Sequence, residues 1–189
     1  MEQFQSSHQS RSPFPLDQVR VIHDRWNPAY QAHPLLPPVA LQALLSGEVQ
    51  GLFVALFENE RPPQGISGWL DQMFDHAVTR AIRSGIVTGK AGEACLIPMT
   101  RTLRKDQVYP VVLIGGGVLP IERDPAKRAL LKFEFPESGL QAIQKTMTGM
   151  AKGGVWKKAA ISASDFLMQE PKTLEKKLST TGGKLWITA

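Results

Sequence analysis

Short apolar runs alternate with amphipathic stretches along this chain. Residues 51–57 are almost wholly apolar, which is typical of a short strand buried on both faces of a parallel sheet. Pro110 lies in another apolar run and either weakens that strand or stands at its beginning. The other strands are predicted at residues 19–23, 94–98, 108–114, 158–163 and 184–188.

The clearest helix is predicted at residues 67–83. Ser67 is its expected N-cap, and Gly85 follows its last turn. Its apolar residues recur in pairs every four positions and form one stripe: Trp69, Leu70, Met73, Phe74, Ala77, Val78, Ala81 and Ile82. Shorter helices are predicted at residues 39–45, 138–150 and 173–178.

This alternation predicts an α/β fold with a mostly parallel sheet, right-handed crossovers and helices on both faces. Residues 1–17 are rich in Ser, Gln and Pro, and we expect them to form a flexible arm. Residues 18–189 are then expected to form a single domain, because 42% apolar residues suffice for a core.

Composition restricts the function only loosely. No apolar run approaches the ~20 residues that span a bilayer, and the N-terminus lacks the apolar region of a signal peptide. The single cysteine, Cys95, excludes an intrachain disulfide, and its apolar neighbours predict an inert buried thiol. A cytoplasmic protein is therefore expected. The net charge of +5 permits an acidic partner, but the basic residues form only short clusters, so nucleic acid is not the favoured partner.

A series of motifs between Gly51 and Gly117 has a recognisable order. An apolar strand leads into an acidic-then-basic turn at residues 58–61, and an amphipathic helix follows Gly65 and Gly68. The segment Gly89-Lys90-Ala91-Gly92-Glu93 then introduces the next apolar strand, and a later strand ends in Gly115-Gly116-Gly117. In this order and spacing, the chain resembles the N-terminal domain of the leucine aminopeptidase family.

The resemblance implies a three-layer α/β/α sandwich of the macro-domain type, with a mixed, mostly parallel sheet. In that family, catalysis belongs to a separate C-terminal domain with two metal ions and a motif of the form Asn-Thr-Asp-Ala-Glu-Gly-Arg. That motif does not occur here, and the sequence ends at Ala189, about where that domain would begin. We therefore expect a non-catalytic interaction, oligomerisation or regulatory module, without catalytic residues, cofactor or metal. The implied partners are further copies of the chain, or a separate subunit that supplies aminopeptidase activity.

A second hypothesis is a macro-like module that binds a nucleotide such as ADP-ribose. Gly115, Gly116 and Gly117 follow a predicted strand, at the sheet edge where open α/β folds bind ligands. The strand predicted at residues 158–163 is not followed by a counterpart of the Gly-rich second phosphate loop of macro-like domains, and Ser164 and Asp165 occupy that place instead. These five residues are the candidate ligand-binding residues. The glycines also suit a tight turn without a ligand, which is the commoner use of glycine.

Other constellations offer weaker chemistry. Residues 85–91 fall one residue short of a phosphate-binding P-loop, and Ala91 stands where the motif needs a hydroxyl. The four histidines lack the spacing of metal ligands, and no nucleophile motif occurs, so an enzyme is the least favoured hypothesis. Trp156, between glycine and lysine, is the candidate for an exposed aromatic that stacks on a base.

Overall fold

The structure is a computed structural model that describes residues 37–101, 104–120, 134–167, 171–178 and 183–188. All of these residues belong to one unit, Leu35–Ala189. The arm predicted at residues 1–17, the strand predicted at 19–23 and the boundary between arm and domain lie outside the described residues.

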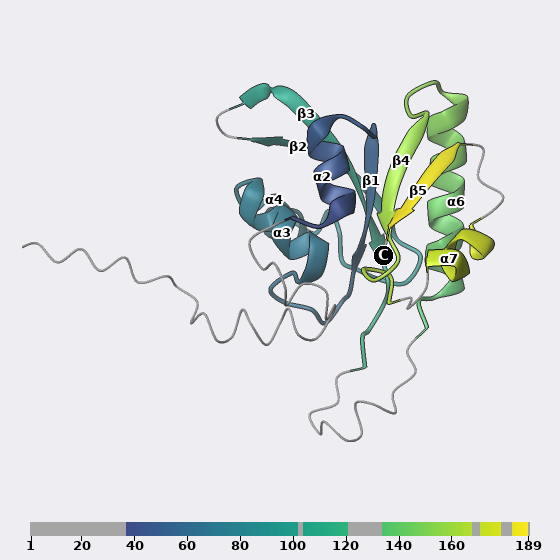
Figure 1. Cartoon of the computed structure of the whole chain (residues 1–189). Coiled ribbons are helices and arrows are strands. Elements are labelled where there is room, and N and C mark those ends of the chain that lie inside the picture. The colour runs from purple at the N-terminus through teal and green to yellow at the C-terminus, as the bar shows by residue number, and fades with distance from the viewer. Residues whose placement is uncertain (1–36, 102–103, 121–133, 168–170, 179–182, 189) are drawn as a thin grey trace, which may run out of the picture. The chain divides into compact units, whose positions relative to one another are not determined.

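Five strands form one mixed sheet in the order β2-β3-β1-β4-β5 (Figure 1). Strands β3, β1, β4 and β5 run parallel, and β2 pairs with β3 antiparallel. All six residues of β1 are buried, as its unbroken apolar run predicts. The strands are β1 (Gly51–Leu56), β2 (Ala94–Arg101), β3 (Arg104–Gly115), β4 (Lys158–Ser162) and β5 (Lys184–Thr188).

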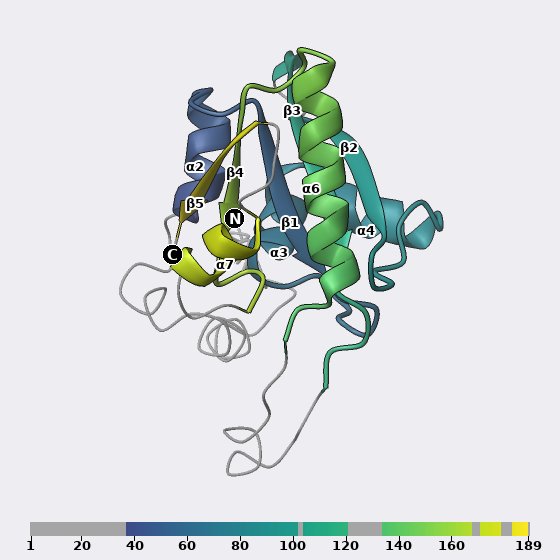
Figure 2. The ribbon, with the colours of Figure 1, turned by 90° about the vertical axis from the view of Figure 1, so that its right-hand side faces the viewer.

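Helices cover both faces of this sheet. The first face carries α2 (Val39–Ser46), α3 (Gly65–Met73) and α4 (Ala77–Arg83), and the opposite face carries α6 (Glu137–Lys152) and α7 (Pro171–Lys177) (Figures 1 and 2). Buried side chains of β1 and β3 pack under the first group of helices, and the buried stripe Leu140, Ile143 and Met147 of α6 faces the other side of the sheet. The predicted three-layer α/β/α architecture is therefore confirmed.

The prediction of one continuous helix over residues 67–83 is wrong. The chain leaves the helical conformation at Asp75 and His76, whose φ angles are +52° and +56°. The second helix is held at its start by Asp71, whose carboxylate accepts hydrogen bonds at 2.7 Å from both the backbone N–H and the hydroxyl of Thr79. Ser67 is not an N-cap either, because it lies inside α3 and donates to the carbonyl of Gln64.

Pro110 lies inside β3 and not at its beginning. At this position β3 is paired only with β2, since its pairing with β1 starts at Val111. The missing N–H of proline therefore removes no hydrogen bond from the parallel part of the sheet.

Candidate functional site

The chain changes direction in the sheet between β1 and β4. From the carboxyl end of β1 it leaves through α3 and α4 on one face to reach β3, and from β4 it leaves through α7 on the other face to reach β5. Adjacent parallel strands whose connections depart on opposite faces leave a crevice outside their carboxyl ends, where α/β folds bind ligands. A ligand site is therefore expected at this switch point.

Asp165 lies at this switch point, in the segment that follows β4. Its Oδ2 accepts a hydrogen bond from the backbone N–H of Ala55 in β1 at 2.7 Å, and its Oδ1 accepts one from Ile66 in the first turn of α3 at 3.3 Å. Gly65, with φ +56°, passes so close that a Cβ atom there would stand 3.1 Å from Oδ1. One carboxylate thus joins the end of β1 to the start of α3.

The environment of Asp165 favours its neutral form. Desolvation raises the pKa of this carboxyl to about 7, although the hydrogen bonds from Ala55 and Ile66 act in the opposite direction. The residue as a whole is only partly buried. A buried carboxyl with a raised pKa at a switch point is a candidate functional group.

Ser164 precedes Asp165 and carries a hydroxyl at the same edge. Its Oγ lies 2.8 Å from the Oγ of Ser162, the last residue of β4. Ser162 is buried, whereas Ser164 is partly exposed. The hydroxyl of Ser164 is therefore the one of the pair that a ligand can reach.

Gly115, Gly116 and Gly117 lie at the other side of β1, at the end of β3. Their backbone N–H groups donate to the carbonyls of Glu93, Leu56 and Gly89 respectively, at 2.8, 2.9 and 2.8 Å. A Cβ at Gly115 would stand 1.8 Å from the carbonyl oxygen of Lys90, and one at Gly116 would stand 2.3 Å from the ring of Phe57. Close packing therefore already requires glycine here, and a ligand that used these N–H groups would have to displace a backbone carbonyl from each.

Sequence reasoning missed the side chains that hold these loops in place. Arg61 donates to the carbonyls of Phe57, Glu60 and Thr88, so it joins the loop after β1 to the loop before β2. Glu93 accepts three hydrogen bonds from Thr88 and Gly89 at 2.7–3.0 Å. The sequence signals for these roles are the acidic-then-basic turn that ends at Arg61 and the glycines that precede Glu93.

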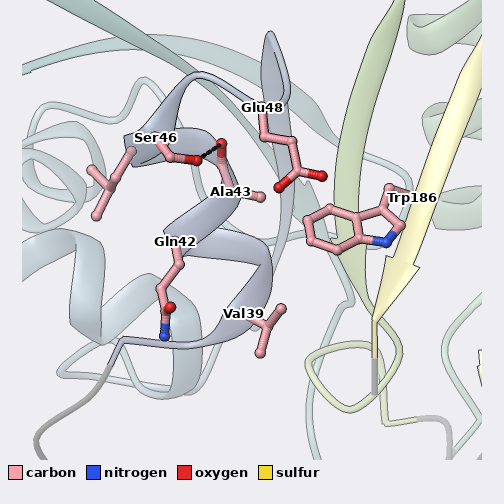
Figure 3. A pocket seen from close by; sticks show the side chains of 7 residues that line it. Val39, Gln42, Ala43, Ser46, Glu48 and Trp186 are labelled. Carbon is pink, nitrogen blue, oxygen red and sulfur yellow. Dashed lines mark hydrogen bonds between the residues drawn. The ribbon is translucent and has the colours of Figure 1, made fainter.

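An open hollow of about 470 Å³ lies elsewhere, between α2 and β5 (Figure 3). Lys158 stands over the ring of Trp186 at 4.9 Å and pairs with Glu48 at 3.1 Å. The hydroxyl of Ser46 donates to the carbonyl of Ala43. Glu48 is the single ionisable group in the lining, which consists of Val39, Gln42, Ala43, Leu45, Ser46, Glu48 and Trp186. No pair of acid and base groups meets in this hollow.

The remaining candidates have structural positions. Trp156 is only 1% exposed and packs edge-on against Phe53, so the hypothesis that it stacks on a base is wrong. His76 contacts Asp71 at 3.2 Å, where the second helix begins. Cys95 is partly buried, and desolvation, with a smaller contribution from the charge of Glu93, raises the pKa of its thiol.

The described residues offer neither a metal site nor a membrane-spanning helix. No group of three or more His, Cys, Asp or Glu side chains there is arranged to hold a metal ion. None of the described helices is long and apolar enough to cross a membrane.

Comparison with known proteins supports the fold. No family model and no curated protein matches the sequence. Among solved structures, the chain is similar to the macrodomain of Thermus aquaticus DarG, with a TM-score of 0.50 and 14% identity over 77% of this chain and 93% of that one. The macrodomain of Mycobacterium tuberculosis DarG gives a TM-score of 0.45 and 11% identity over the same shares.

The likeness to the Thermus aquaticus macrodomain confirms the predicted macrodomain-like fold at the level of architecture. The finer resemblance, to the N-terminal domain of leucine aminopeptidases, finds no support in the comparisons.

Proposed function

We propose that this chain is a macrodomain-type binding module for a nucleotide of the ADP-ribose class, and that the ligand enters the crevice between the carboxyl ends of β1 and β4. The observation that carries the proposal is the position of Asp165. Its carboxyl lies at the switch point of the sheet, joins β1 to α3, and has a pKa raised to about 7 by desolvation.

The chemistry of Asp165 favours the nucleoside part of such a ligand. The start of α3 attracts anions, but the Asp165 carboxyl already occupies this position through its hydrogen bond with Ile66 and leaves no room there for a phosphate. Each carboxylate oxygen accepts more than one hydrogen bond. Asp165 therefore suits a donor, such as the amino group of a base or a ribose hydroxyl.

Ser164 can add a second polar contact, because a hydroxyl both donates and accepts. Gly115, Gly116 and Gly117 complete the proposed site on the opposite side of β1. Since their N–H groups are already bonded and neighbouring residues fill the space that their side chains would take, we assign them to the wall of the site, as backbone packed against the loop at Lys90.

Calorimetric titration tests this proposal. ADP-ribose, AMP, adenosine and ribose 5-phosphate are titrated into the wild type and into the variants Asp165→Asn and Ser164→Ala. We expect ADP-ribose and adenosine to bind, and Asp165→Asn to weaken both by about tenfold or more. Ribose 5-phosphate should bind least, since it lacks the base.

The matched control is Asp75→Asn, which changes an exposed carboxylate that is paired with Arg80 outside the crevice. It should bind like the wild type. A flat titration of the wild type at millimolar ADP-ribose would overturn the proposal, and so would equal affinity in the Asp165→Asn variant with its circular dichroism unchanged.

An interaction module is the second candidate function. One observation favours it: part of the sheet carries exposed apolar side chains that none of the described helices covers. Aminopeptidase activity supplied by another chain would be one case of such an interaction. Size-exclusion chromatography with light scattering, alone and after mixing with a leucine aminopeptidase catalytic domain, tests it.

A further inference from the structure

On the face of the sheet that carries α6 and α7, the described helices leave most of β2 uncovered (Figure 2). Leu96 of β2 is 46% exposed and Val108 of β3 is 53% exposed, whereas Met99 on the opposite face is buried. Their same-face neighbours Ala94, Pro98 and Thr100 are exposed as well, and Pro110 is partly exposed. We call these six residues the uncovered face. They include no charged side chain, which is unusual for an exposed surface.

The free edge of β2 is poorly suited to binding another strand. The backbone N–H of Gly115 donates to the carbonyl of Glu93, so these two residues form a hydrogen-bonded pair. Hydrogen-bonded and non-hydrogen-bonded pairs alternate along β2 and β3, and Pro98 and Pro110 therefore form a pair without hydrogen bonds between them. The nitrogen of Pro98 then points to the free edge, where it has no hydrogen to donate. Proline on an edge strand disfavours strand addition. The apolar face, and not the edge, is the surface available to a partner.

One flank of α6 borders this face. A Cβ at Gly92, just before β2, would stand 2.9 Å from the Cβ of Ser138, so Ser138 marks the flank that faces β2. Residues four apart lie in one row on a helix, and this row is uncharged: Ser138, Ala142, Thr146 and Met150. The opposite flank has a neighbouring helix, because Gln144 donates to the carbonyl of Lys177 in α7 at 2.9 Å.

We propose that the uncovered face binds one amphipathic helix of a partner protein, laid beside α6 with its apolar stripe on β2 and β3. The helix would continue the layer that α6 and α7 form over the rest of the sheet. The eight residues of β2 extend for about 26 Å, which matches a helix of about 17 residues. The small side chains of Ala142 and Thr146 allow a second helix to approach α6 closely.

The charges around the face indicate an acidic flank on this helix. Lys145 and Lys152 are exposed along α6, and a helix beside α6 would bring its own flank within reach of them. Asp or Glu there would add complementary charge. A second copy of this chain is a poorer occupant, because α2, α3, α4 and α6 bury most of their apolar residues on their own sheet and α7 ends in lysines.

Selection from a display library of random peptides, each about 18 residues long, tests this proposal. The wild type is the target, and the double variant Leu96→Glu, Val108→Glu serves for counter-selection. We expect enriched sequences with apolar residues at spacings of three and four and with Asp or Glu on one flank. Enrichment of sequences with strictly alternating apolar residues, or no enrichment, would overturn the proposal.

The best peptide is then synthesised with a fluorophore, and its affinity is measured by anisotropy. We expect the double variant to bind at least about tenfold more weakly, and Lys145→Glu with Lys152→Glu to weaken binding and flatten its salt dependence. Ile86→Glu is the matched control, because Ile86 is equally apolar and 61% exposed but lies after α4. Leu96→Gln repeats the test without an added charge if the double variant unfolds.

Equal affinity for the Leu96 and Ile86 variants would contradict the proposal. So would a dimer in sedimentation that Leu96→Glu dissociates, because a second copy would then cover the face. Neither result bears on nucleotide binding, which the calorimetric titration measures separately.

Discussion

The backbone N–H of Ala55 donates a hydrogen bond to the carboxylate of Asp165 across 2.7 Å, although 110 residues separate the two in the chain. The ladder between β1 and β4 ends at Phe53 and Ile161, so Ala55 lies beyond the last strand partner on that side. The Asp165 side chain takes the place that the next residue of β4 would fill. Its titration therefore affects both the stability of the sheet and the proposed site.

The variant Asp165→Asn should change the pH dependence of stability. The pKa of Asp165 is about 7 in the folded chain against 3.8 in the unfolded chain, so between these values the folded state holds a proton that the unfolded state releases. The stability that Asp165 contributes is complete below about pH 3.8 and is lost as pH rises through about 7. Relative to the Asn variant, the free energy of unfolding should fall by at most about 1.4 kcal/mol per pH unit.

Urea unfolding at about pH 4.5, 6 and 8, followed by tryptophan fluorescence, measures this difference. Asp75→Asn is the control, since it makes the same substitution at an exposed carboxylate that is paired with Arg80 away from the sheet. Parallel stability curves for the wild type and Asp165→Asn would contradict the assignment of a raised pKa.

The strands and the helix α6 could be predicted from the sequence because each is a local pattern. The apolar run of β1 and the spacing of Leu140, Ile143 and Met147 are visible within a few residues. The break between α3 and α4 was missed for a related reason. The apolar residues keep the same helical spacing before and after Asp75 and His76, where the helix breaks. The spacing alone therefore does not reveal the break.

The candidate site was predictable only in outline. The sequence placed Ser164 and Asp165 after a strand, but the partners Ala55 and Ile66 lie about a hundred residues earlier, and no local pattern identifies them. Likewise, three successive glycines indicate that another backbone segment or a ligand approaches the chain closely at these positions. The close neighbour at Gly115, the carbonyl of Lys90, becomes known only from the fold.

Removing the Asp71 carboxylate should destabilise the start of α4. Asp71→Ala deletes the acceptor for the N–H and hydroxyl of Thr79 and for His76. We expect a loss of about 1–2 kcal/mol in the free energy of unfolding, the usual cost of a lost helix cap. Asp75→Ala, which removes only the exposed pair with Arg80, should cost less than about 0.5 kcal/mol. Equal losses in the two variants, measured by urea unfolding, would show that Asp71 does not hold the helix start.

Two substitutions of glycine by alanine should change stability in opposite directions. At Gly115 the new Cβ would stand 1.8 Å from the carbonyl oxygen of Lys90, so a backbone segment has to move, and we expect a loss of more than about 2 kcal/mol. At Gly149, an exposed position in α6 with no atom within 4 Å of the new Cβ, alanine should add about 0.5–1 kcal/mol because it favours the helix. Urea unfolding of both variants beside the wild type measures these changes. Equal stability of Gly115→Ala and Gly149→Ala would contradict this prediction. The loop at Lys90 would then have to pack less closely against β3 than the hydrogen bond between Gly115 and Glu93 requires.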